Sequence, residues 1–496
     1  MIFIFVIIPI LTAILLTLFN KLDRRWLGVV TSAALGVNLV AAFILISKLA
    51  GNGFQPVVYK LGGWTVPMGI LLVADGLTAF MLVLINLISM ICAVYSIKYM
   101  DKFLDEWKYF VLFLMLTASF NGAVLSGDIF NMFVFIEMGT ISAAALIAFD
   151  TAPEELESAF RYMIFGSAAA LFVMLGIALT YAYTSTLNMA DVAVSIVLNK
   201  NVALISFITV LFIIGFFTKS AVVPFHFWLP DAHSSAPSPV SAMLSGILVK
   251  VLGLYALTRI IFNVLGADVS AVLMAFGVVS MIVGGLLAVY QKDIKRLLAY
   301  STISQVGYIL FAFGLNTQLG FFAGLFHMFN HAVAKSLMFL TSGAVMYATD
   351  ERILDNFGGG LRKKMPLTSI TSFIGSMSIS GLPPLGGFWS KLLIVIAAVQ
   401  SGKYGYALIA VVVSIITLSY FIKWHKEIFF GELPEKWSNI KESPLVMLLP
   451  MIILALLCAV SGFLLLPGIS SNFLEPAAKV LSGGVEYGKT VLELAK

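Results

Sequence analysis

Residues 216–233 read FFTKSAVVPFHFWLPDAH, where Lys219 lies in an apolar run five residues before Pro224. Residues 378–393, SISGLPPLGGFWSKLL, place a second lysine, Lys391, just after a group of helix breakers: Gly381, Pro383, Pro384, Gly386 and Gly387. Proline removes a backbone donor and clashes with the preceding turn, whereas glycine tolerates unusual dihedrals. We therefore expect two helices that break near mid-membrane, with their freed backbone groups lining a polar cavity or buried in protein.

The composition of the chain points to a membrane protein. Of its 496 residues, 60% are hydrophobic and 11% are charged, whereas soluble domains carry about a quarter charged residues. This excludes a soluble enzyme, a nucleic-acid binder and a disordered chain. The net charge of +5 comes from short loops between apolar runs and does not indicate a basic surface. Cys92 and Cys458 lie in apolar runs, which predicts buried thiols.

Apolar runs of the length needed to cross a bilayer, about 20 residues, recur along the whole chain. Helices are favoured over a barrel because barrel strands are shorter and alternate in polarity. The predicted fold is therefore an all-α integral membrane protein of about fourteen transmembrane helices. The predicted spans are 2–20, 27–48, 70–97, 109–126, 129–149, 160–184, 202–228, 238–262, 269–290, 297–315, 320–346, 367–400, 404–430 and 444–466.

Charge around the first span indicates its orientation. Lys21, Arg24 and Arg25 follow the span and no positive residue precedes it, the reverse of a cleaved signal peptide. With the N-terminus outside, more than half of the 30 Lys and Arg residues fall in cytoplasmic loops. We predict a multi-pass membrane protein with both termini outside the cytoplasm.

The charged residues in the interior of apolar spans, away from loops and helix ends, are Glu137, Lys219, Lys250, Lys335 and Lys391. A charge at the bilayer centre costs about 2.5–3.5 kcal/mol on insertion scales, and such residues commonly mark ion or proton pathways. Burial lowers the pKa of a lysine, whereas a guanidinium stays charged, so buried lysines suit proton transfer. The pattern indicates a string of switchable proton sites. The alternative is that the charges pair only to fix helix packing.

His327, His331 and Lys335 are spaced i, i+4 and i+8 in HMFNHAVAK, so they share one helix face. The two histidines have the spacing of helical metal ligands, but no Cys, Asp or Glu completes the set, and we predict no metal site. They are either proton-pathway residues or hydrogen-bonded core histidines. Lys335 lies nearer a helix end, where a lysine can snorkel.

Structural roles are expected for three further charged residues. Arg259 and Asp128 resemble residues at the membrane interface, and Asp75 is a lone acid near the start of the third span. No functional role is predicted for any of them.

The two interrupted helices divide the chain into related parts. Each is the fourth helix of a five-helix unit, and an odd number of helices forces the second unit to be inverted. The predicted units are residues 1–108 (helices 1–3), 109–262 (first repeat, helices 4–8), 269–430 (second repeat, helices 9–13) and 444–496 (helix 14 and the C-terminal tail).

Several separated segments resemble the proton-conducting membrane transporter family. They are ESAFRYMIFGS (157–167), PDAHSSAPSPVSAMLSGILVK (230–250), KRLLAYSTISQVGY (295–308) and NHAVAKSLMFL (330–340). That family includes the antiporter-like subunits of respiratory complex I and the large subunits of Mrp-type multisubunit cation/proton antiporters. The resemblance covers roughly residues 120–430 and implies fourteen helices, two inverted repeats and discontinuous helices seven and twelve.

The resemblance also implies roles for individual residues. Glu137 matches the family's carboxylate on helix five, Lys219 its partner on helix seven, and Lys250 the connecting lysine on helix eight. His327 and His331 match the histidine region of helix eleven, which also contains Lys335, and Lys391 matches the ionisable residue of helix twelve.

The segments around the two interruptions, which contain Lys219 and Lys391, resemble the D-type subunits of the Mrp branch most. This resemblance implies a multi-pass protein of the bacterial cell (plasma) membrane. The implied function is proton translocation within a multisubunit Na⁺/H⁺ antiporter, with a large A-type subunit and small membrane subunits as partners and protons and Na⁺ as transported ions. The alternative is an N- or M-type proton-pumping subunit of complex I. The sequence carries no quinone, flavin or iron–sulfur ligand pattern and no nucleophile–base pair, so we expect no cofactor and no catalysis by the chain itself.

Overall fold

The computed structural model describes residues 2–19, 24–199 and 201–495. Lys21, on which the orientation prediction partly depends, lies outside the described residues. The first half of the fold contains α1 (Ile4–Leu18), α2 (Arg24–Gly51), β1 (Val57–Lys60), β2 (Leu71–Ala74), α3 (Gly76–Tyr99), α4 (Glu106–Leu125), α5 (Ile129–Ile147), α6 (Pro153–Thr184), α7 (Met189–Leu198), α8 (Val202–Lys219), α9 (Trp228–Ser235), α10 (Ser238–Met243), η3 (Leu244–Tyr255), α11 (Ala256–Thr258) and η4 (Arg259–Leu265).

The second half is also helical. It contains α12 (Ser270–Tyr290), α13 (Ile294–Gly314), α14 (Gln318–Thr349), α15 (Pro366–Ser380), α16 (Gly386–Gln400), α17 (Tyr404–Ile428), α18 (Leu445–Val460), α19 (Pro467–Ser482) and α20 (Glu486–Ala495). Short 3₁₀ turns link several of these elements.

Eleven helices among the described residues are long and apolar enough to cross a membrane. The prediction of a helical integral membrane protein is confirmed, although a two-stranded sheet of β1 and β2 is present besides the helices. The other three predicted spans correspond to α1, to α14 and to the pair α15 and α16, none of which belongs to that set of eleven. That fourteen helices cross the membrane stays a prediction.

In both segments in which we expected a break, one helix ends and another begins a few residues later, whereas a break at mid-membrane depth stays a prediction. α8 ends at Lys219 and α9 begins at Trp228, with Pro224 in the connection; α15 ends at Ser380 and α16 begins at Gly386. Gly381 follows α15 with a φ of 84°, a left-handed conformation that glycine adopts without steric cost. The inverted relation of the two five-helix units stays a prediction.

The start of the third predicted span was wrong. Residues 71–74 form strand β2, which pairs antiparallel with β1, and α3 begins only at Gly76. A short apolar run such as Leu71–Ala74 fits a strand or a helix equally well, so periodicity does not separate them. Asp75 ends the strand and caps α3, because its Oδ1 accepts a hydrogen bond of 2.9 Å from the Thr78 amide.

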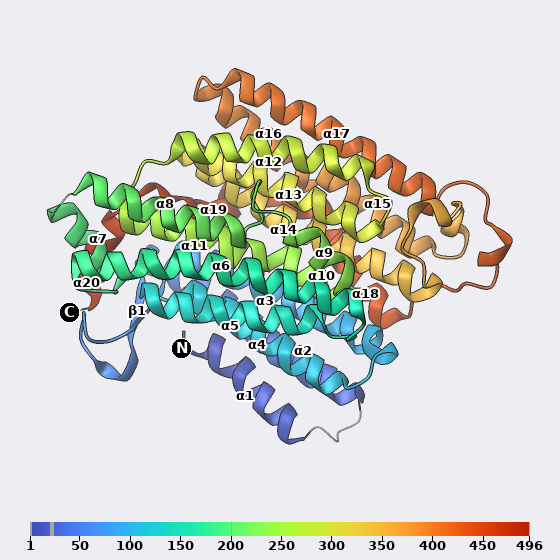
Figure 1. Ribbon diagram of the computed structural model, residues 1–496, viewed down its shortest axis with the longest axis horizontal. Coiled ribbons are helices and arrows are strands. Elements are labelled where there is room, and N and C mark those ends of the chain that lie inside the picture. The colour runs from blue at the N-terminus through green and yellow to red at the C-terminus, as the bar shows by residue number, and fades with distance from the viewer. Residues whose placement is uncertain (1, 20–23, 200, 496) are drawn as a thin grey trace.

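α14 runs through the middle of the bundle, with α16 and α17 along one edge and α1 along the opposite edge (Figure 1). It packs against α10, α13, α15, α16, α18 and α19, and its side chains from Leu325 to Val345 are buried. Residues 244–255 and 259–265 are π-helical, and residues 238–265 are buried throughout. The charged residues on these two segments therefore lie inside protein.

Candidate functional site

Glu137 and Lys219 form an ion pair between α5 and the last residue of α8. The Lys219 Nζ lies 2.9 Å from Glu137 Oε1 and also donates a hydrogen bond of 2.7 Å to Thr140 Oγ1. Thr140 follows Glu137 by three residues, so both acceptors come from one face of α5. The lysine side chain is 3% exposed and the glutamate side chain 27% exposed. The buried Lys219 ammonium therefore has a counter-charge and a second hydrogen-bond acceptor. The Glu137 side chain, in contrast, is partly exposed at the surface of the protein.

Lys250 lies on the π-helical segment η3 and is completely buried. Its Nζ donates a hydrogen bond to the carbonyl oxygen of Ser245 on the same segment. Within the described part of the chain, no carboxylate forms an ion pair with this lysine. π-helical turns are rare and frequently occur at functional sites.

Lys335 lies in the interior of α14 and is also completely buried. Its Nζ donates a hydrogen bond of 3.0 Å to the carbonyl oxygen of Leu298 on α13 and lies 5.7 Å from the ring centroid of Phe421 on α17. The expectation that this lysine could snorkel from a helix end was wrong, because α14 continues for fourteen residues to Thr349.

His327 and His331 lie on the same face of α14, with nearly parallel rings whose centroids are 6.2 Å apart. His327 Nδ1 is 2.9 Å from Ser390 Oγ on α16. A small cavity beside the two rings is lined by the buried side chains of Gln305 and Asn330 and by the start of α16. Among the described residues, no protein group forms a hydrogen bond with either ring nitrogen of His331 or with the Gln305 amide. Orphaned buried polar groups of this kind are the usual partners of internal water.

Lys391 lies on α16 beside the second interruption. It is 6% exposed, its Nζ donates a hydrogen bond of 3.1 Å to Ser414 Oγ, and it lies 4.8 Å from the ring centroid of Tyr308. The Ser414 hydroxyl in turn donates to the carbonyl oxygen of Ser380, the last residue of α15. The lysine is thus linked to a backbone carbonyl at the break, and none of the described carboxylates pairs with it.

Sequence reasoning missed a second buried ion pair. Arg259 Nη1 lies 2.8 Å from Asp75 Oδ2, both side chains are 2% exposed, and the rings of Tyr255 and Tyr487 lie against the guanidinium. Arg259 therefore has a buried partner and a structural role, whereas its position at the membrane interface stays a prediction. An arginine inside a long apolar segment was the available signal, but its partner lies 184 residues away.

Asp128 has a local structural role. Its Oδ1 accepts a hydrogen bond of 2.8 Å from the Asn131 amide and caps α5, and burial raises the pKa of its carboxyl group. It lies one residue before the helix that carries Glu137 and makes no ion pair among the described residues.

Arg259→Gln would leave the buried Asp75 carboxylate without a counter-charge. We therefore expect this variant to lower the free energy of unfolding of the purified protein by about 3 kcal/mol, which is measured as a lower melting temperature. The control is Lys292→Gln, whose pair with Asp355 is exposed and should have little effect on the melting temperature. Adding Asp75→Asn to Arg259→Gln should restore part of the stability. Equal melting temperatures for all variants would contradict a stabilising role of the pair.

The fold and these buried groups define a polytopic membrane protein whose interior holds lysines, of which Lys250, Lys335 and Lys391 pair with none of the described carboxylates. Residues 126–417 match the family described as "NADH:quinone oxidoreductase/Mrp antiporter, TM", and residues 59–110 match "NADH-Ubiquinone oxidoreductase (complex I), chain 5 N-terminus". The chain belongs to the first of these families, which covers more than half of its length.

Curated relatives and solved structures agree with this membership. The chain is 32% identical to the D-type subunit of a Na⁺/H⁺ antiporter from Alkalihalophilus pseudofirmus over 98% of each chain. It is 34% identical to the N-type subunit of an NADH-quinone oxidoreductase from Desulforudis audaxviator, over 92% of this chain and 94% of the relative. A chain of the Mrp complex from Dietzia sp. DQ12-45-1b superposes with a TM-score of 0.91 at 28% identity, covering 99% of both chains. A chain of an archaeal membrane-bound sulfane sulfur reductase gives a TM-score of 0.90 at 30% identity over the same shares.

Proposed function

We propose that the chain is a proton-translocating subunit of a multisubunit Na⁺/H⁺ antiporter in the bacterial plasma membrane, acting as a secondary transporter subunit and not as an enzyme. The observation that carries the proposal is the buried Glu137–Lys219 pair at the point where α8 ends. Beyond it follow Lys250, Lys335, the two α14 histidines and Lys391, all buried. The similarity to antiporter subunits of type D over nearly the whole chain supports the same function.

The Glu137–Lys219 pair can act as a switch for protons. Protonating the carboxylate removes the counter-charge of Lys219, so the ammonium then loses the interaction that offsets its burial. A lysine in that state is ready to release its proton towards the interior of the bundle. Only groups that change protonation can pass this signal on, and lysine and histidine do so where arginine does not.

Lys250, Lys335 and the histidines lie on the central elements η3 and α14, which pack against each other. We propose that they form the middle of the path, with orphaned polar groups beside His331 holding the water that would connect them. Lys391, next to the second interruption, forms the far end. The proposed repeats, residues 109–262 and 269–430, would each place one interrupted helix on this path.

The partial exposure of Glu137 supports assembly with partner subunits. A carboxylate that is 27% exposed on the face of a membrane helix is costly if that face meets lipid. We propose that neighbouring subunits of the antiporter, which include a large A-type subunit and small membrane proteins, cover this face of α5.

A second candidate is a proton-pumping subunit of complex I, favoured by the 34% identity to an N-type subunit of an NADH-quinone oxidoreductase. Purifying the native assembly decides between the two. The antiporter should copurify with other membrane subunits, show no flavin or iron–sulfur absorbance, and drive sodium-dependent proton movement in inverted vesicles. Copurification with flavin and iron–sulfur proteins, or vesicles without sodium-dependent proton flux, would contradict the antiporter assignment.

A further inference from the structure

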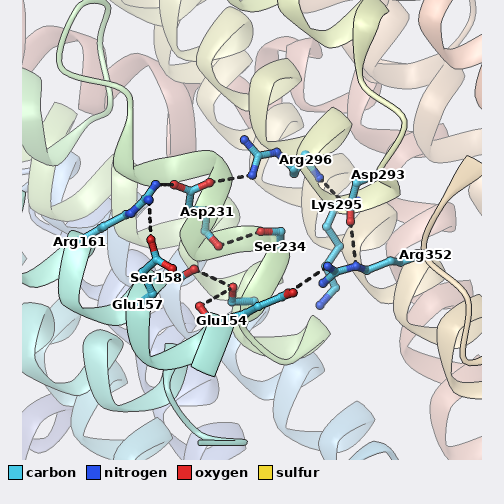
Figure 2. Close-up of polar contacts among 11 residues, drawn as sticks. Glu154, Glu157, Ser158, Arg161, Asp231, Ser234, Asp293, Lys295, Arg296 and Arg352 are labelled. Carbon is cyan, nitrogen blue, oxygen red and sulfur yellow. Dashed lines mark hydrogen bonds and ion pairs between the residues drawn. The ribbon is translucent and has the colours of Figure 1, made fainter. Parts of the chain in front are cut away.

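A cluster of charged side chains lies where α6 and α13 begin, and its centre is Asp231 on α9 (Figure 2). Arg161 Nη1 lies 2.7 Å from Asp231 Oδ2, and Arg296 Nη1 lies 2.7 Å from Asp231 Oδ1. The aspartate side chain is 17% exposed, much less than either guanidinium. Each carboxylate oxygen therefore has its own arginine, one on α6 in the first proposed repeat and one on α13 in the second.

Further contacts hold the C-terminal end of α9. Lys295 Nζ, on α13, donates a hydrogen bond of 2.7 Å to the carbonyl oxygen of Ala236, directly after α9. Ser235 Oγ lies 2.7 Å from Ser158 Oγ on α6. Arg352 joins the same two parts of the chain, at 3.0 Å from Glu154 and 3.3 Å from Asp293 (Figure 2).

α9 has eight residues and non-helical segments on both sides, so its position depends on its neighbours. Isolated helices shorter than about 12 residues are marginal in water. Exposed ion pairs contribute little to overall stability, but the Asp231 pairs fix one short element between two long ones. Their main effect is therefore on the geometry of α9.

α9 in turn contacts the end of α8. Trp228, its first residue, donates a hydrogen bond of 2.9 Å from Nε1 to the carbonyl oxygen of Thr218, the residue before Lys219. Its ring lies 5.0 Å from the ring of Tyr162, which follows Arg161 on α6. One turn further along α6, a Cβ at Gly166 would lie 2.9 Å from Thr140 Cγ2 and 3.9 Å from Lys219 Nζ. α6 and α9 together therefore frame the Glu137–Lys219 pair.

We propose that Asp231 is a positioning residue for the Glu137–Lys219 pair, because it pins α9 between Arg161 and Arg296 and thereby fixes the end of α8. This role rests on the proposed function. It also makes the geometry of the pair depend on α13, an element of the second repeat. Asp231 touches neither transported ion in this role and acts only through α9.

The test is Asp231→Asn in the intact antiporter complex, with sodium-dependent proton flux measured in inverted vesicles across a pH series. We expect normal assembly, a flux lower by about ten- to a hundredfold, and a pH midpoint shifted by at least about half a unit, because a small displacement of a proton-transfer pair changes both rate and protonation. Asp231→Glu should restore most of the flux and return the midpoint towards the wild-type value.

Asp355→Asn is the matched control. Lys292 forms a hydrogen bond with this aspartate and lowers the pKa of its carboxyl group, so the pair is charged at neutral pH, but it is exposed and does not involve α9. This variant should keep the wild-type rate and midpoint. A change equal to that of Asp231→Asn would show a general effect of surface charge and overturn the proposal.

A wild-type flux and a wild-type pH midpoint for Asp231→Asn would overturn the proposal. The same holds if Asp231→Asn lowers the flux without shifting the midpoint and Asp231→Glu does not restore the flux. If the Asp231→Asn complex fails to assemble, Arg296→Gln replaces it, because this variant removes only one of the two ion pairs of Asp231. An unchanged pH midpoint in Arg296→Gln would then overturn the proposal. Loss of flux in Glu137→Gln with wild-type behaviour of Asp231→Asn rejects only this inference, whereas normal flux in Glu137→Gln rejects the proposed function.

Discussion

Replacing Glu137 by glutamine should lower sodium-dependent proton flux by about a hundredfold. This factor is at the lower end of the rate enhancement that a positioned proton-transfer group provides. Glutamine keeps the size of the side chain and an acceptor for the Lys219 ammonium, which lies 2.9 Å from the carboxylate. It cannot take up or release a proton, so the switch is lost while the packing of α5 is kept. Proton flux in inverted vesicles measures the effect, and subunit recovery after purification measures assembly.

Two further variants sharpen this test. Lys219→Ala removes the other half of the pair and should reduce flux to the same extent, since the two residues act as a unit. Glu435→Gln, at an exposed position in a short 3₁₀ turn, makes the same chemical change without touching the pair and should leave flux unchanged. Normal exchange by both Glu137→Gln and Lys219→Ala would remove the pair from the proton path. Failed assembly of both would instead favour the reading in which the charges only fix helix packing.

Replacing Lys391 by arginine should also lower flux by about a hundredfold, although the positive charge is kept. A guanidinium does not release its proton at any relevant pH, whereas an ammonium can. The site between Ser414 and the Tyr308 ring accommodates a long cationic side chain. The flux assay is the same, with Lys403→Arg, at an exposed position, as the matched control.

Lys391→Gln separates charge from titration. If Lys391 passes protons, both the arginine and the glutamine variants lose flux. If it supplies only a fixed positive field, arginine retains flux and glutamine loses it. Wild-type flux from the arginine variant would therefore contradict a proton-transferring role for Lys391 but would still leave it an electrostatic one.

The amino-acid sequence alone was enough to predict a helical membrane protein. With 60% hydrophobic and 11% charged residues, the chain has too few charged side chains to cover a water-exposed surface. The sequence also singled out Glu137 and the lysines, because a charge inside an apolar run is visible without any structure. Pro224 and the glycines and prolines around 381–387 marked the interruptions for the same local reason: each changes the backbone of its own segment.

Tertiary structure decided which distant groups meet. The partner of Arg259 is 184 residues away, and Asp231 joins an arginine 70 residues before it to one 65 residues after it. Such pairings depend on how helices pack side by side, and no local pattern encodes them. The same holds for strand β2 and the π-helical turns around Lys250, where residues 71–74 and 244–255 have the composition of ordinary membrane helices. Local chemistry therefore specifies which residues are unusual, and only packing specifies what each of them touches.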